Sequence, residues 1–501
     1  MPEKKQFRAI KGTRDILPPD SSLWNWFEQT AREVFESYNF RDIRSPIFEE
    51  TDLFARSIGV ETDVVGKEMY TFEDKSAALR NLSTFAGLDE QLTTIEDLLK
   101  TQQIPDTESN RSTLISVKQR VSEYKASLQE PGRGDSDKLL QQCFFLLYYF
   151  QLSERLTLRP EATASVCRAY IEHGMHALAG NVKLYYIGPM FRRERPQKGR
   201  YRQFYQIGAE VLGQSDAPAI DAEVLEMLLV FFRRVGLTRT TLFVNSIGDK
   251  ECRPKYVELL REELLKVKDQ LGADSQRRIE TNPLRVLDSK LPQEQAIIEK
   301  LSRISDHLCD ACREHFANLK NELKLRNINY EENWRLVRGL DYYTRTTFEV
   351  TAEGLGSQNA VCGGGRYDGL VELLGGPPTK GIGFAIGSDR AILSIQEGAE
   401  AHTLPGLSVY IAWMGAASYP AAVSIARKLR EAGLSVEMPP EEMKFKKSLG
   451  LADKLGARYA LILGEDEVAS NKFTLKRLAD AEQNKFSEYE LLEYLESERR
   501  G

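Results

Sequence analysis

The sequence lacks any long run of apolar residues. The longest run, from Cys143 to Phe150, is far shorter than the roughly 20 residues that a membrane-spanning helix needs. The segment M-P-E-K-K-Q-F-R-A-I-K-G at the start of the chain contains no apolar core of the kind found in export signals. We therefore expect a protein that does not enter a membrane and that is located in the cytoplasm.

Cysteine is also scarce, and six cysteines among 501 residues do not form a disulfide framework. One cluster, H-x-C-x-x-C-x-x-H, has two interpretations and consists of His307, Cys309, Cys312 and His315. These side chains could be zinc ligands. Alternatively, they are positions on one amphipathic helix that includes residues 305–320, where they cannot converge tetrahedrally. We favour the helix and predict no metal site made of protein ligands alone.

Two common nucleotide-binding motifs are missing. The chain contains no G-x-x-x-x-G-K-[ST] and no strand-bound G-x-G-x-x-G, and the segment G-I-G-F-A-I-G at residues 381–387 has the spacing of neither. The sequence therefore supports neither a P-loop nor a Rossmann dinucleotide site.

Positive charge is concentrated in one segment of a chain whose formal net charge is -6. Residues 192–202 contain six basic side chains and one acidic side chain, between two segments rich in aromatic and β-branched residues. This pattern predicts two antiparallel strands joined by a basic loop. The loop is either a solvated charged hairpin or a binding site for a polyanion.

Three other segments place polar side chains at turns. Glu161 and Thr163 follow a short strand, where the alternative is an ordinary acidic helix N-terminus. Arg338 precedes two adjacent tyrosines in a turn between strands, and Arg390 lies in the first turn of a helix that follows a glycine-rich strand. Arginine suits bidentate phosphate contacts, so arginines that converge on one cleft would favour a nucleoside triphosphate.

The length of 501 residues predicts two or three domains. Residues 76–154 alternate helical and polar segments and carry no catalytic pattern, and proline-separated helices fill residues 250–325. After a linker-like segment, residues 406–501 alternate strands and helices, which predicts a compact α/β domain.

Six motifs occur in order along the chain: K-G-T-R-D-I-L-P, T-L-R-P-E-x-T-A, F-R-R-E-R-P-Q-K-G-R-Y-R-Q-F, R-G-L-D-Y-Y-T-R-T-x-F-E, C-G-G-G-R-Y-D-G-L and G-F-A-I-G-x-D-R. Together they resemble the motifs of the histidyl-tRNA synthetases, a family of class II aminoacyl-tRNA synthetases. The resemblance covers nearly the whole chain apart from residues 76–154.

The resemblance implies an α+β fold in which helices flank an antiparallel sheet. The catalytic domain would comprise residues 1–75 and 155–396, interrupted by the insertion 76–154 and carrying the helical insertion 250–325. Residues 406–501 would form an anticodon-binding domain, and a homodimer would form through the region of Pro46. The insertion 76–154 could cover the cleft, contact tRNA or bind a partner.

The resemblance also assigns roles to individual residues. Arg338 and Arg192 would be catalytic. Histidine would be bound by Glu161, Thr163, Arg192, Gln206, Glu210, Arg338, Tyr342 and Tyr343. ATP would be bound by Arg192, Glu194, Arg200, Phe204 and Arg390. Glu194 would contact either the adenine or a partner within its own loop.

The activity implied is that of a histidine–tRNA ligase, which uses L-histidine, ATP, Mg²⁺ and tRNA(His). Ala162 stands where the family more often has glycine or methionine. Ser388 and Asp389 stand where Leu-Glu is common, and the aspartate keeps the charge but shortens the reach. The alternative function is a non-catalytic, synthetase-like regulatory subunit of ATP phosphoribosyltransferase, which usually lacks the anticodon domain.

Overall fold

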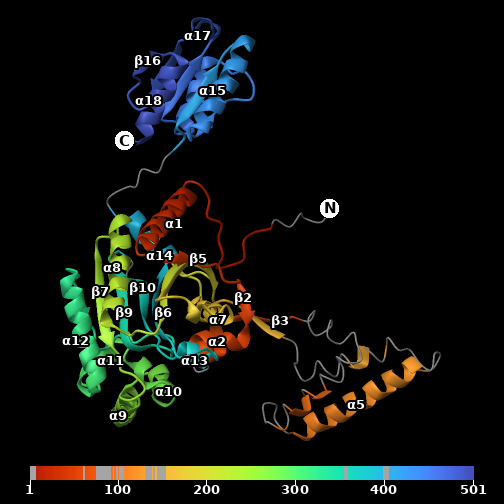
Figure 1. The fold of residues 1–501 in the computed structure, drawn as a ribbon, viewed down its shortest axis with the longest axis vertical. Helices are drawn as coiled ribbons and strands as arrows, with labels where there is room; N and C mark the ends of the chain where they lie inside the picture. The colour runs from red at the N-terminus through yellow and green to blue at the C-terminus, as the bar shows by residue number, and fades with distance from the viewer. Residues whose placement is uncertain are drawn as a thin grey trace. The chain divides into compact units, whose positions relative to one another are not determined.

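The computed structural model describes residues 7–59, 62–74, 107–129, 154–354, 359–398 and 406–500, with a few isolated residues between 92 and 143. The chain divides into two compact units, residues 1–400 and residues 401–501 (Figure 1). Among the described residues, no helix is both long enough and apolar enough to cross a membrane.

The larger unit is built on an eight-stranded sheet in the order β1-β5-β6-β11-β10-β9-β7-β8. The inner six strands are antiparallel, and β1 and β8 each pair in parallel at an edge. The strands are β1 Arg41–Asp42, β5 Val182–Phe191, β6 Gln203–Gly213, β7 Thr240–Ser246, β8 Glu331–Glu332, β9 Thr344–Ala352, β10 Ala360–Arg366 and β11 Lys380–Gly387.

The hairpin predicted around the basic loop is present. Strands β5 and β6 pair antiparallel from Val182 opposite Leu212 to Phe191 opposite Gln203, and residues 192–202 connect them. The second half of β6 is buried at every position, and most of β5 is buried as well, as expected for central strands that are covered on both faces.

Helices pack on the sheet through a cluster of buried aromatic rings. Phe35 lies edge to face with Phe231 and with Phe384, at 5.8 Å between ring centroids in both pairs. These contacts join α1 (Asp20–Ser37) and α8 (Pro218–Arg234) to strand β11. Helix α14 (Ser388–Glu397) begins directly after β11 and packs on β6.

A second, three-stranded sheet has the order β2-β4-β3 and comprises β2 Phe48–Glu50, β3 Tyr70–Asp74 and β4 Glu154–Leu158. Strand β2 follows Pro46 and occupies an edge, as expected for a strand next to proline. Around this sheet lie α2 Thr51–Ile58, the π-helix Val64–Glu68, α7 Thr163–Glu172, the 3-10 helix Met175–Ala177 and α13 Leu370–Leu373.

Short helices make up the insertion after β7. Pro254 and Pro292 stand at the starts of two of them, as predicted from the proline spacing. The helices are α9 Arg253–Lys266, α10 Ala273–Thr281, α11 Pro292–Ile298 and α12 Asp310–Leu325, with 3-10 turns at Lys268–Gln270, Pro283–Val286 and Ile304–His307.

The single helix predicted over residues 305–320 is wrong. The 3-10 turn ends at His307, and α12 begins at Asp310 with Cys309 in extended conformation at its N-cap position. The two cysteines therefore lie at a helix start, where their side chains are not confined to one helical face.

Within the insertion at 76–154, the structure describes one long helix, α5 (Glu108–Gln129). Two other segments of the insertion lie largely outside the described residues. They are the helical segment expected at 87–100 and the apolar, aromatic run at 143–150.

The smaller unit contains a five-stranded sheet in the order β13-β12-β14-β15-β16, parallel in its first three strands and antiparallel in the rest. The strands are β12 Val409–Trp413, β13 Val436–Glu437, β14 Tyr459–Leu463, β15 Phe473–Arg477 and β16 Gln483–Phe486. The helices are α15 Tyr419–Glu431, α16 Phe445–Lys454, α17 Glu465–Ser470 and α18 Glu488–Arg500, with a 3-10 turn at Ala416–Ser418.

Candidate active site

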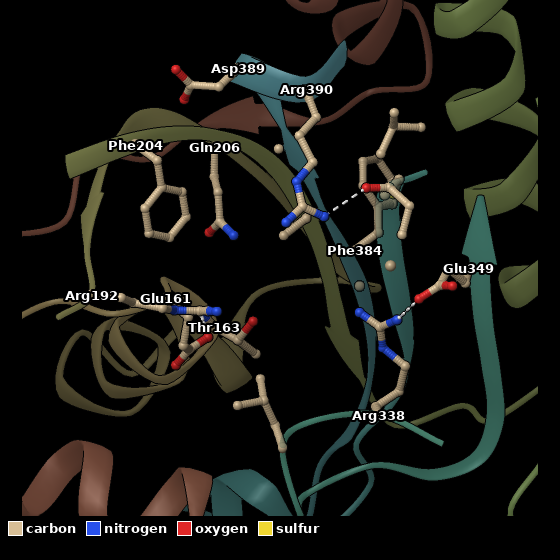
Figure 2. A pocket seen from close by; sticks show the side chains of 18 of the residues that line it. Glu161, Thr163, Arg192, Phe204, Gln206, Arg338, Glu349, Phe384, Asp389 and Arg390 are labelled. Atoms are coloured by element: carbon tan, nitrogen blue, oxygen red, sulfur yellow. Dashed lines mark hydrogen bonds and ion pairs between the residues drawn. The ribbon is translucent and has the colours of Figure 1, made fainter. Parts of the chain in front are cut away.

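A cavity of about 570 Å³ lies over the glycine-rich strands of the large sheet. Every residue that the sequence singled out for histidine or ATP binding lines this cavity, although these residues are spread from position 161 to position 390. Figure 2 shows Glu161 and Thr163 on one side of the cavity and Arg338 and Arg390 on the other. Arg192 lies beside Glu161 in the same view, and Glu349 pairs with Arg338, so carboxylates and guanidinium groups occur on both sides of the cavity.

Glu161 has both a structural contact and access to the cavity. Its carboxylate accepts hydrogen bonds from the backbone N–H groups of Thr163, at 2.7 Å, and Ala164, at 3.0 Å, and so binds the first turn of α7. Burial raises the pKa of Glu161 in spite of these bonds. The alternative of an acidic helix N-terminus is thus correct for this residue, and it is compatible with a role in the cavity.

Glu210 on β6 is held from two sides. The Thr163 hydroxyl donates to Glu210 Oε1 and the Tyr367 hydroxyl donates to Oε2, both at 2.7 Å. Burial raises the pKa of Glu210 to about 8, although both hydroxyl bonds favour the ionised form. This carboxyl group can therefore change its proton occupancy near neutral pH.

The basic loop contributes guanidinium groups at its root and on its return strand. Arg192 Nε donates to the Pro160 carbonyl at 2.9 Å, and its guanidinium lies 5.4 Å from the centroid of the Phe204 ring. Glu194 forms ion pairs with Arg192, at 3.9 Å, and with Arg200. Of the two contacts considered for Glu194, the structure contains the partner within the loop.

Positive charge accumulates near Arg390. Burial lowers the pKa of Arg390, and the positive charges of Arg200 and Arg192 lower it further. Glu194 balances part of this charge through its ion pairs with Arg192 and Arg200. An anion near Arg390 would reduce the remaining repulsion, and guanidinium groups suit the phosphates of a nucleotide.

Arg338 lines the cavity beside Glu349. Its Nη1 donates to Glu349 Oε2 at 2.7 Å, a bond drawn in Figure 2. A Cβ added at Gly363 on β10 would lie under 3.0 Å from this guanidinium, so the glycine provides the space in which it rests. Gly383 on β11 provides the same kind of space beside the Glu210 carboxylate. The missing side chains of Gly363 and Gly383 thus allow Arg338 and Glu210 to lie close to the backbone of the sheet.

Two buried polar atoms in the cavity have no hydrogen-bond partner in the described protein. They are Arg338 Nε, a donor, and Gln206 Oε1, an acceptor. Buried polar atoms are almost always paired, and the exceptions call for an explanation such as a bound ligand. The two atoms would fit a ligand with an acceptor near Arg338 and a donor near Gln206.

Comparison with known proteins agrees with this geometry. The family model described as Histidyl-tRNA synthetase matches residues 116–391, and the model described as Anticodon binding domain matches residues 408–498. A protein named histidine–tRNA ligase from Koribacter versatilis is 48% identical over 492 residues, which cover 97% of this chain and 96% of that protein. The chain belongs to the histidyl-tRNA synthetase family. A second histidine–tRNA ligase, from Solibacter usitatus, is 45% identical over 98% of this chain and 99% of its own length.

Among solved structures, apo histidyl-tRNA synthetase from S. aureus superimposes with a TM-score of 0.69 at 32% identity, covering 98% of this chain and 100% of that one. This match agrees with the α+β class II synthetase fold. The matched spans extend over nearly the whole chain, on both sides of residues 76–154.

The departure from the family pattern at Asp389 has a structural explanation. Its Oδ1 accepts a hydrogen bond from Arg14 at 2.8 Å, and its Oδ2 accepts one from the backbone N–H of Tyr205 at 3.0 Å. Asp389 therefore joins the N-terminal K-G-T-R-D motif to helix α14 and strand β6. Both carboxylate oxygens have protein partners in this arrangement.

Several lining residues were not given a role from the sequence: Tyr186, Asp288, Lys290, Glu349 and Tyr367. Glu349 is opposite Gly363 in the register of β9 and β10, so only strand pairing places it beside Arg338. Arg366 and Tyr367 are neighbours in the motif C-G-G-G-R-Y-D-G-L, but only Tyr367 lines the cavity. The Arg366 side chain is buried against Asp221 and Asp368.

Proposed function

We propose that the chain is a histidine–tRNA ligase, which activates L-histidine with ATP and transfers it to the 3′ end of tRNA(His). One observation carries the proposal for this site: the residues implied by the family resemblance line a single cavity, which brings several guanidinium groups together with carboxylate and amide acceptors. Such a set of side chains complements an amino acid next to a triphosphate.

The amino-acid end of the site would use the acceptors on β6 and at the start of α7. The ammonium group of histidine would donate to Gln206 Oε1, which is buried without a partner, and would lie near the Glu161 carboxylate. Glu210 and Tyr343 would contact the two imidazole nitrogens, which need one acceptor and one donor. Such a pocket rejects amino acids that leave its buried polar groups unpaired.

The nucleotide end would use the arginines. Arg192 would contact the α-phosphate, Arg200 and Arg390 the outer phosphates, and Phe204 would stack on the adenine. Arg338 would lie between the histidine carboxylate and the α-phosphate, where its unpartnered Nε supplies a donor.

The first step needs no nucleophile from the enzyme. A carboxylate oxygen of histidine attacks the α-phosphorus of ATP, the bond from this phosphorus to the bridging oxygen breaks, and pyrophosphate leaves as histidyl-adenylate forms. The residues contribute alignment and stabilisation of the charge that develops on the phosphate oxygens.

Mg²⁺ is proposed as a companion of ATP. The described carboxylates of the cavity have protein partners: Glu349 pairs with Arg338, Glu194 with Arg200, and Asp389 with Arg14. These residues do not by themselves form a cation site, so the ion would depend on the phosphate oxygens.

In the second step, a hydroxyl of the terminal ribose of tRNA attacks the carbonyl carbon of the adenylate, and AMP leaves. The smaller unit, matched by the anticodon-binding model, would bind the other end of the tRNA. Helix α16 presents exposed Phe445 beside exposed Lys446 and Lys447, a combination that suits an unstacked base and its phosphate.

A homodimer is proposed through the edge of the three-stranded sheet. Ile47 and Phe48 are 45% and 51% exposed beside Pro46, and Phe72 on the same sheet is 43% exposed. The rings of Phe48 and Phe72 lie 6.2 Å apart and form an apolar surface next to an unpaired strand edge. We further propose a cytoplasmic location, where the free thiols of all six cysteines would stay reduced.

The regulatory-subunit alternative is not favoured. A structure described as an ATP phosphoribosyltransferase regulatory subunit/histidyl-tRNA synthetase from Bacillus halodurans matches at a TM-score of 0.54 and 15% identity, which indicates the shared fold alone. This chain also has the anticodon-binding unit that such subunits usually lack.

The test is histidine-dependent exchange of labelled pyrophosphate into ATP by the full-length chain. We expect exchange that requires histidine and that falls by about 100-fold or more in Arg338→Ala. Exchange that is absent from the wild-type chain would refute the ligase activity. Full exchange in the variant would instead refute only the role of Arg338.

A further inference from the structure

The two ends of the helical insertion meet at a cluster of three thiols and one carboxylate. Asp249 and Cys252 lie between β7 and the start of α9, and Cys309 and Cys312 lie at the start of α12, so that Cys252 and Cys312 are 60 positions apart in the sequence. One ligand atom from each of the four residues lies within 4.8 Å of all the others. The cluster is separate from the histidine and ATP cavity, since none of its members lines that cavity.

The distances within the cluster match tetrahedral metal coordination. Sulfur ligands about 2.3 Å from a zinc ion at tetrahedral angles lie about 3.8 Å from one another, and a carboxylate oxygen lies slightly closer to each sulfur. Cys252 Sγ and Cys312 Sγ are 3.8 Å apart, and Asp249 Oδ1 is 3.6 Å from Cys252 Sγ and 3.9 Å from Cys309 Sγ. These three distances are close to those of a tetrahedral shell, and every other pair of ligand atoms lies within 4.8 Å.

Two of the four ligands lie at helix starts. Cys252 and Cys309 occupy the N-cap positions of α9 and α12. The Asp249 carboxylate is held beside them, because its Oδ1 accepts a hydrogen bond from the Glu251 backbone N–H at 3.0 Å.

The cluster also has an ordered outer contact. Arg345 Nη2 lies 3.5 Å from Asp249 Oδ2, leaving Oδ1 directed to the thiols. The backbone of Arg345 is hydrogen-bonded to Ile247 and Gly248 on the same turn, at 2.8 Å and 2.7 Å. Contacts of this kind orient the ligands of metal sites and balance their negative charge.

We propose that Asp249, Cys252, Cys309 and Cys312 form a structural site for a thiophilic divalent metal ion, Zn²⁺ by preference. Three thiolates and one carboxylate suit zinc, and four protein ligands close the coordination sphere. The ion would join the two ends of the insertion at its root. This proposal replaces the prediction of no protein-only metal site, and it does not depend on the proposed ligase activity.

Sequence inspection weighed the wrong set of ligands. The pattern H-x-C-x-x-C-x-x-H drew attention to His307 and His315, but His307 packs beside the Tyr256 ring. His315 Nε2 lies 3.0 Å from the Asp216 carbonyl oxygen. The informative signal is the pairing of D-x-x-C with C-x-x-C, which only the fold brings together.

The metal site has a direct connection to the proposed active site. Arg253, the residue after Cys252, donates from Nη1 to the backbone carbonyl of Tyr343, which lines the histidine cavity. A metal that fixes the start of α9 would therefore also fix this contact.

The experiment measures metal on the full-length chain purified under reducing conditions. We expect about one zinc per chain by elemental mass spectrometry. After chelation and addition of Co²⁺ alone, we expect the visible absorption of tetrahedral cobalt and the near-ultraviolet thiolate-to-cobalt band. Both signals should be lost in Cys252→Ser and Cys309→Ser and kept in His307→Gln, which removes a ligand of the rejected pattern.

Three results would overturn the proposal: a reduced wild-type chain that binds neither ion stoichiometrically, cobalt spectra without the thiolate band, or full metal content in both serine variants. The wild-type measurement decides the matter even where a serine variant fails to fold. A Cys252–Cys312 disulfide found in the freshly purified, metal-free chain would also refute it, because that bond removes two of the ligands.

Discussion

Gly363→Ala is expected to displace Arg338 without removing any charge from the cavity. A methyl group at this position would lie under 3.0 Å from the guanidinium. The backbone of β10 tolerates alanine there, because Gly363 lies in a regular antiparallel pair opposite Glu349 and has no positive φ. The side chain of Arg338 must therefore move, since its far end is more flexible than the strand beneath it.

The effect on stability should be small. The displaced Arg338 would lose its ion pair with Glu349, whose side chain is 27% exposed while that of Arg338 is 22% exposed. A pair with this degree of solvent access contributes about 1 kcal/mol or less. Alanine would in turn stabilise the chain by about 0.4–1 kcal/mol, because it restricts the unfolded state. These terms nearly cancel, so the thermal midpoint should change little.

The effect on catalysis should be much larger. Loss of one correctly placed donor to a developing oxyanion lowers kcat by about 100- to 1,000-fold, or about 2.7–4 kcal/mol. The assay is pyrophosphate exchange at saturating histidine and ATP, with thermal unfolding measured on the same samples.

The matched control is Gly66→Ala, where an added Cβ meets nothing within 4 Å. This control should keep wild-type exchange. If the Gly363→Ala protein exchanged pyrophosphate as fast as the control, the position of the Arg338 guanidinium against Gly363 would not determine the rate.

Three further predictions follow from single side chains. Burial raises the pKa of Glu210 to about 8 from its ordinary 4.5, so at pH values between these two the folded chain holds a proton on Glu210 that the unfolded chain has lost. The free energy of unfolding of the unliganded chain should therefore fall as the pH rises through this range. Glu210→Gln should make the free energy of unfolding less dependent on pH, and an equal pH dependence in both proteins would contradict the prediction. Arg390→Ala should raise the KM for ATP by about 10- to 100-fold, as expected for a lost charged hydrogen bond, with the KM for histidine nearly unchanged; equal rises in both would exclude a role specific to the phosphates. Phe48→Asp should convert a wild-type dimer to a monomer in light scattering, whereas Leu178→Asp, at a side chain that is 60% exposed elsewhere, should not; a monomeric wild type would end the dimer proposal.

The sequence was sufficient for the parts of the fold that depend on local pattern. The aromatic and β-branched residues on both sides of the basic segment predicted the hairpin of β5 and β6, and Pro254 and Pro292 predicted two helix starts in the insertion. Local patterns succeed here because strand propensity and the missing N–H of proline act within a few residues.

The sequence did not show which residues far apart in the chain lie close together in the fold. Cys309 and Cys312 were assigned to one continuous helix because S-D-H-L-C-D-A-C has helical composition, but the chain turns at Cys309. Their nearness to Asp249 results from packing across about 60 intervening residues. No local signal encodes such a distance.

For the candidate site, the sequence by itself determined which side chains are available and, through motif order, the family to which they belong. Only the tertiary structure decided which atoms meet: Arg338 with Glu349 through the register of β9 and β10, and Thr163 with Glu210 across α7 and β6. The physical reason is that motifs specify chemical groups, whereas hydrogen-bond partners, burial and the resulting pKa values depend on the packing of distant segments.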